Sequence, residues 1–187
     1  MSAIACVGWG SLIWDPRTLP IRGSWFPDGP FLPIEFARTS SRAADKRVTL
    51  VVLPKAPVVR CLWALLAVND LDEAKEALAD REELTGANRL RNIGFWGRDK
   101  KSEHVCVDEV GRWAQSKQLT GVVWTALEPN FMKEFDGASL EKVIEHLRGL
   151  SHAERKHAEE YIRRTPRQID SECRRLIEKV FGWTPIE

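Results

Sequence analysis

Most of the chain before residue 128 has the pattern of β-strands. Short apolar or alternating runs rich in β-branched and aromatic residues, bounded by glycine, proline or polar segments, are typical of strands. The runs predict strands at 4–7, 34–38, 48–53, 58–68, 104–107 and 120–127. Residues 15–33 are rich in proline, which fixes φ and removes a donor, so we expect a loop there. We also expect a loop at 88–101 and a charged linker at 108–119.

Helical patterning occurs once within this part and then dominates the C-terminal part. Residues 70–83 begin with an acidic turn and continue with good helix formers, which predicts a helix. Residues 129–135 predict a short helical turn. After it, Ser151 and Glu154 have the spacing of a capping box. Thr165-Pro166 resembles a further helix start, and an apolar stripe then runs to Gly182, which we expect to end that helix.

These elements predict one α+β domain over residues 1–187. A strand-rich core spans about 1–128, and a helical C-terminal extension spans about 129–187. Strands with one interposed helix and a helical tail suit a barrel or a strongly bent sheet covered by helices. The pattern alone does not choose between a closed barrel and an open sheet.

Composition narrows the setting of the protein. The net charge of +1 argues against broad electrostatic capture of nucleic acid or of an anionic membrane surface. The four cysteines are widely spaced and form no Cys-x-x-Cys pair, which indicates reduced thiols and predicts a cytoplasmic protein. No secretory signal, membrane-spanning stretch or spaced set of metal ligands is apparent. The sequence does not indicate an oligomeric state.

The first strand ends in two glycines, Gly8 and Gly10, separated by one residue. Glycine tolerates positive φ and allows close approach of a ligand or of another backbone segment. Consecutive amide N–H groups in such a turn can hold an anion. A plain turn from a strand into a loop explains the same pattern.

Glu82 is the strongest candidate for acid–base chemistry. At about 100° per residue it lies about 20° from Leu71 and about 40° from Leu78, on the apolar stripe of the predicted helix. Glu83 lies about 120° from Leu71, on the solvent side. A partly desolvated carboxylate suits proton transfer near neutral pH. The alternatives are a carboxylate at the helix end that pairs with Arg81 or another arginine, and a frayed helix end with Glu82 in solvent.

Three segments together resemble the gamma-glutamylcyclotransferase-like family, especially its ChaC-like, glutathione-degrading branch. Gly8-Trp9-Gly10-Ser11-Leu12 is similar to the Tyr-Gly-Ser-Leu signature that opens these proteins. Arg81-Glu82 resembles the family's Arg-Glu pair. The stretches from Phe36 to Ser40 and from Arg47 to Leu50 resemble Phe-x-x-x-Ser followed by Arg-Val-x-Thr-Leu. The resemblance covers about residues 4–127, in order.

The resemblance implies a small mixed β-barrel with flanking helices and a specific reaction. The loop amides would bind the α-carboxylate of a γ-glutamyl compound, and Glu82 would be catalytic. The product would be 5-oxoproline, released together with an amine, and the family's chemistry requires no metal or organic cofactor. The residues implied to bind substrate are Gly8, Trp9, Gly10, Ser11, Leu12, Arg38 and Ser40. Arg38 and Ser40 also fit an ordinary edge strand and a polar turn.

The chain departs from the family at several positions, and these keep other functions open. Trp9 stands where relatives have Tyr, and Glu35 where they often have Arg. The late Gly-Pro-Ser-Gly segment is missing, and Tyr161-Ile162 replaces it poorly. Trp9 could form an apolar wall that favours apolar leaving amines over glutathione, or it could pack into the core. The other functions are a non-catalytic protein that binds a small acid or amide, and a γ-glutamyl amide hydrolase or transferase.

Overall fold

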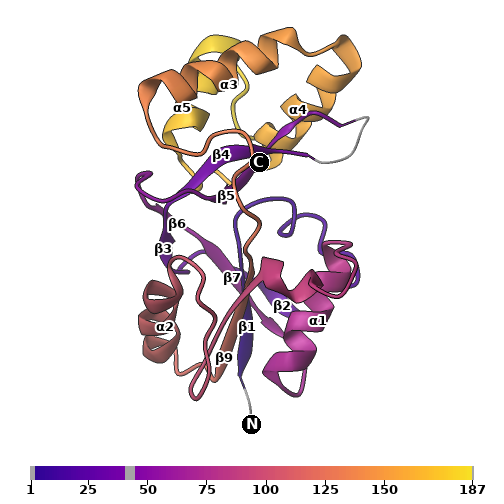
Figure 1. The fold of residues 1–187 in the computed structure, drawn as a ribbon, viewed down its shortest axis with the longest axis vertical. Coiled ribbons are helices and arrows are strands. Elements are labelled where there is room, and N and C mark those ends of the chain that lie inside the picture. The colour runs from indigo at the N-terminus through magenta and orange to yellow at the C-terminus, as the bar shows by residue number, and fades with distance from the viewer. Residues whose placement is uncertain (1–2, 41–44, 187) are drawn as a thin grey trace. The chain divides into compact units, whose positions relative to one another are not determined.

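The computed structural model describes residues 3–40 and 45–186 (Figure 1). Its strands are β1 (Ile4–Gly8), β2 (Ile21–Phe26), β3 (Phe31–Leu32), β4 (Ile34–Thr39), β5 (Val48–Val52), β6 (Val59–Arg60), β7 (Leu62–Leu66), β8 (Ile93–Gly97) and β9 (Gly121–Thr125). Its helices are α1 (Leu71–Arg81), α2 (Val107–Ser116), α3 (Gly137–Gly149), α4 (His152–Arg164) and α5 (Glu172–Phe181), with a 3-10 turn, η1, at Arg89–Asn92. The predicted α+β class is confirmed.

The chain divides into two compact units. The sheet unit comprises the chain up to Gly8, Asp15–Leu32 and Arg60–Leu127. The helical unit comprises Trp9–Trp14, Pro33–Val59 and the chain from Glu128 onward. The helical extension expected from about residue 129 therefore shares its unit with β4 and β5.

The predicted closed barrel is not supported. The sheet unit contains a five-stranded sheet in the order β2-β7-β1-β9-β8, in which β1 runs parallel to β9 and antiparallel to β7. Among the described residues, β2 and β8 are edge strands and do not pair with each other. The barrel fails because β4 and β5 pair with each other in a separate two-stranded sheet, so they do not extend the larger one.

Helices α1 and α2 cover opposite faces of the five-stranded sheet. Successive side chains of a strand point to opposite faces, so two neighbouring residues of one strand identify which helix covers which face. On β8, Gly97 lies against Leu71 of α1, whereas its neighbour Trp96 lies against Gly111 of α2. Gly121 of β9 also lies against Leu71 and is close to Ile4 of β1. Even-numbered residues of β1 and odd-numbered residues of β9 therefore face α1.

In the helical unit, β4 packs against α5, β5 is hydrogen-bonded to Tyr161 of α4, and α3 packs against α5. The capping box at Ser151 and Glu154 is confirmed at the start of α4. Gly182, with a φ of 70°, ends α5 as predicted. The start of α5 was predicted wrongly, since Ser171 rather than Thr165 is its N-cap. Residues 129–135 form no helix.

Four further segments differ from the prediction. Residues 104–107 are not a strand, and the supposed linker after them is α2. Residues 15–33 and 88–101, expected to be loops, contain β2, β3 and β8. The long strand expected at 58–68 is interrupted at Cys61, where β6 ends and β7 begins.

Candidate functional site

The end of α1 determines where Glu82 points. Asp70 caps the start of the helix through the amide of Glu73, and Glu82 is the C-cap. The Glu83 amide donates to the Asp80 carbonyl, and the Leu84 amide donates to the Ala79 carbonyl, both at 3.0 Å. This is a Schellman ending, with Glu83 in the left-handed region at a φ of 57°. The predicted difference in burial is confirmed, because the Glu82 side chain is 16% exposed and that of Glu83 is 56% exposed.

Two hydrogen-bond donors converge on one oxygen of Glu82. Nη1 of Arg81 lies 2.7 Å from Glu82 Oε1, and the Thr125 hydroxyl donates to the same oxygen over 3.2 Å. The Arg81 guanidinium is buried, and its Nε and Nη2 donate to the Asp15 carbonyl at 3.2 and 2.7 Å. No described residue donates to Oε2 of Glu82. The carboxylate is therefore oriented through one oxygen only.

This carboxylate lies on the α1 face of the sheet. Thr125 is the last residue of β9, and β1, which is parallel to β9, ends at Gly8. Carboxyl ends of parallel strands are the usual place for ligands in open sheets. Cys6 faces the same side, and burial raises the pKa of its thiol far above the ordinary value, an effect that the nearby Glu82 carboxylate increases and Arg81 opposes. The Cys6 thiol is therefore held protonated.

The glycine loop belongs to the helical unit from Trp9 onward. It turns through a hydrogen bond of 3.0 Å from the Ile13 amide to the Gly10 carbonyl. Neither Gly8 nor Gly10 has a positive φ, so the conformational reason expected for these glycines is wrong. Instead, a Cβ on Gly10 would lie 2.5 Å from the Tyr161 hydroxyl. Among the described residues, no acceptor is found for the amides of Gly10 and Leu12.

Aromatic side chains hold this loop in place. Trp9 is buried, and its indole N–H donates to the Leu50 carbonyl at 3.1 Å. Trp14 meets Tyr161 edge to face, with ring centroids 5.5 Å apart. The Arg47 guanidinium lies over the Tyr161 ring at 5.1 Å. Tyr161, which sequence reasoning treated as a poor match to the family, is thus the residue around which the loop packs.

Arg38 and Ser40 have structural contacts in the same unit. Nη1 of Arg38 donates to the Glu128 carbonyl at 2.7 Å, which ties β4 to the segment leading to α3. The Ser40 amide donates to the Arg47 carbonyl at 3.1 Å and closes the β4–β5 hairpin. These contacts give Arg38 and Ser40 a structural role that requires no ligand.

Sequence reasoning did not find the role of Glu35. Its side chain is fully buried and accepts hydrogen bonds from the Ser171 hydroxyl at 2.5 Å and the Cys173 amide at 3.1 Å. A carboxylate at a helix N-terminus satisfies amides that lack an intrahelical partner and complements the helix dipole. Burial nevertheless raises the pKa of Glu35, although these hydrogen bonds and one from the Phe36 amide lower it. Glu35 therefore joins β4 to α5.

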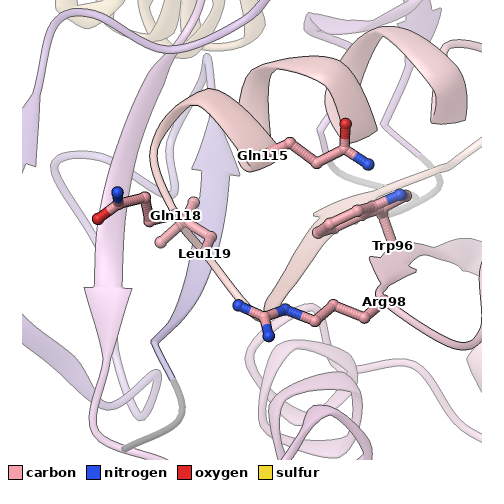
Figure 2. A pocket seen from close by; sticks show the side chains of 5 residues that line it. All are labelled: Trp96, Arg98, Gln115, Gln118 and Leu119. Carbon is pink, nitrogen blue, oxygen red and sulfur yellow. The ribbon is translucent and has the colours of Figure 1, made fainter.

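A separate hollow of about 560 Å³ lies beside α2 (Figure 2). It is lined by Trp96, Arg98, Gln115, Gln118 and Leu119. Figure 2 shows the Trp96 ring between the side chains of Gln115 and Arg98. None of the residues predicted to bind substrate lines this hollow.

The structure brings together only part of the predicted site. Glu82 and Gly8 belong to the sheet unit, whereas Trp9, Gly10, Ser11, Leu12, Arg38 and Ser40 belong to the helical unit. No group of three potential metal ligands is found in residues 3–40 and 45–186. Within the same residues, no helix is long and apolar enough to cross a membrane. No family model matches the chain, and no curated protein or solved structure matches it significantly.

Proposed function

We propose that this protein is a gamma-glutamylcyclotransferase-like enzyme that converts a γ-glutamyl amine or peptide into 5-oxoproline and a free amine. The observation that carries the proposal is the Glu82 carboxylate. It is oriented through Oε1 by Arg81 and Thr125 and presents an oxygen without a described donor. Its position at the carboxyl end of the parallel strand pair supports a ligand site there. The resemblance of three segments to the family supplies the reaction.

In the helical unit, the amides of Gly10 and Leu12 have no described acceptor and are available to an anion such as a carboxylate. In the sheet unit, the proposed reaction depends on Glu82. Glu82 accepts a proton from the α-ammonium group, and the amine attacks the γ-carbonyl carbon of the same molecule. Glu82 then protonates the departing amine. Both reacting groups belong to one substrate, so holding the folded-back conformer supplies much of the rate.

A non-catalytic protein that binds a small acid or amide is the second candidate. The observation that favours it is the close Arg81–Glu82 pair, because a neutralised carboxylate at a helix end can be purely structural. The buried Trp9, whose N–H is already used by Leu50, adds to this reading. The placement in the cytoplasm stays a prediction from the wide spacing of the four cysteines.

The experiment that tests the proposal is a product assay. The purified protein is incubated with glutathione, γ-glutamyl amino acids and γ-glutamyl arylamides, and 5-oxoproline, glutamate and released amine are quantified. The cyclotransferase predicts 5-oxoproline and amine in equal amounts. Glutamate in place of 5-oxoproline would identify a hydrolase, and a γ-glutamyl adduct of an added amine would identify a transferase. Binding without turnover would identify the second candidate.

A further inference from the structure

Among the described residues, Thr125 is the sheet residue whose side chain is hydrogen-bonded to Glu82. As the last residue of β9 it faces α1, and its hydroxyl donates to Glu82 Oε1 at 3.2 Å. Its β-branched side chain has a restricted χ1, so the hydroxyl is held by the strand. Arg81 adds a second donor to the same oxygen and is itself fixed by the Asp15 carbonyl. The carboxylate plane is therefore set by two rigid donors on different elements.

We propose that Thr125 is the positioning residue for Glu82, so that Oε2 is the oxygen that exchanges protons with the γ-glutamyl substrate. This inference rests on the proposed function. Oε1 is occupied by two donors, whereas Oε2 has no donor among the described residues. The Glu82 side chain retains 16% exposure, through which a substrate can reach it.

The proton balance of the step is complete with Oε2 alone. Oε2 takes one proton from the α-ammonium nitrogen, whose lone pair forms a C–N bond to the γ-carbonyl carbon. Oε2 then gives this proton to the nitrogen of the leaving amine, as the bond between that nitrogen and the γ-carbonyl carbon breaks. A second proton follows the same route from the ring nitrogen to the released amine. Glu82 ends as the carboxylate, and no oxidant or other reactant is consumed.

The test compares Thr125→Val, which keeps the shape but removes the hydroxyl, with Thr125→Ser, which keeps the hydroxyl. In Thr125→Val we expect kcat to fall on the order of 10- to 100-fold, with KM changed less than about twofold, because misplaced catalytic groups lower the rate of the chemical step. Thr125→Ser should restore most of kcat, because it returns a hydroxyl donor to Oε1.

Thr120→Val is the matched control. Thr120 directly precedes β9, and its hydroxyl also donates a hydrogen bond of 3.2 Å, here to the Ala3 carbonyl. We expect it to leave kcat unchanged. Thermal unfolding of all three variants shows whether they are folded. The inference is overturned if folded Thr125→Val matches the wild type, if Thr120→Val loses as much activity, or if Thr125→Ser restores nothing. If the wild type forms no 5-oxoproline, or Glu82→Gln is fully active, the proposed function falls and the inference falls with it.

Discussion

The Tyr161 hydroxyl occupies the space that a side chain at Gly10 would need. A Cβ at Gly10 would lie 2.5 Å from this oxygen, whereas the next ring atom is 3.5 Å away. The Leu50 amide donates to the same hydroxyl at 3.4 Å, so the tyrosine cannot move away without losing a buried hydrogen bond. Gly10 is therefore required by the close approach of α4, which the Gly-x-Gly spacing alone does not reveal.

We expect Gly10→Ala to lower the free energy of unfolding by about 1–3 kcal/mol, because the added methyl group overpacks the interior. Tyr161→Phe removes the clashing oxygen and leaves ordinary contact distances. The double variant should therefore be more stable than Gly10→Ala alone, as measured by urea unfolding. Equal stabilities of Gly10→Ala and the double variant would contradict the role of the Tyr161 hydroxyl.

The Tyr161→Phe background separates binding from packing in the loop. If amides near Gly10 hold a carboxylate, a Cβ at Gly10 still obstructs the ligand after the clash is relieved. In this background we expect Gly10→Ala to raise KM for a γ-glutamyl substrate by about tenfold, an effect equivalent to about 1.4 kcal/mol. Ser11→Ala, which retains the amide, should change KM much less. Equal KM values for Gly10→Ala and Ser11→Ala would show that the loop does not bind the substrate.

Glu35 predicts a specific pH dependence of stability. Its pKa in the folded protein is raised above the ordinary 4.5, because burial disfavours the charged form. The folded state then binds the proton more tightly than the unfolded state, so the contribution of this group to stability falls as pH rises above about 4.5. Glu35→Gln cannot ionise. We expect the stability of Glu35→Gln relative to wild type to increase between pH 5 and pH 8 in chemical denaturation, and a constant or decreasing difference would contradict this.

Trp9 is expected to act through packing. Its indole is buried, and its N–H is bound to the Leu50 carbonyl. Trp9→Phe should lower the free energy of unfolding by about 2 kcal/mol, through lost volume and a carbonyl left without its donor. The ratio of kcat/KM for glutathione and for a γ-glutamyl arylamide should remain the same in Trp9→Tyr. A changed ratio would show that Trp9 contacts the leaving amine.

The sequence predicted those elements whose local signals agree with their packing. The burial of Glu82 followed from helical phase, and the start of α4 followed from the Ser151–Glu154 capping box. Strand β1 was equally clear, as an apolar run ended by Gly8. In these cases the residues that define the element lie next to one another along the chain.

The elements that were missed depend on distant partners. Strand β8 resembles a loop because of its glycines, yet Gly94 is needed beneath the Trp124 indole of the neighbouring strand. Helix α2 has Gly111 in its middle because Trp96 packs there. Likewise Glu35 appeared as a departure from the family pattern, since its partner Ser171 is remote in the sequence. Such contacts between distant segments are set by tertiary packing, which overrides local propensity.

In the proposed reaction, Glu82 carries the proton during cyclisation of a γ-glutamyl substrate. The most direct measurement is the rate of 5-oxoproline release by wild type, Glu82→Gln and Glu83→Gln, each shown to be folded. Glu83 is a matched control because it is adjacent, exposed and paired with Arg17. We predict that Glu82→Gln loses at least about 100-fold in kcat, in the range typical of general acid–base catalysis, and that Glu83→Gln stays within about twofold of wild type. Retained activity in Glu82→Gln, or an equal loss in both variants, would contradict the account.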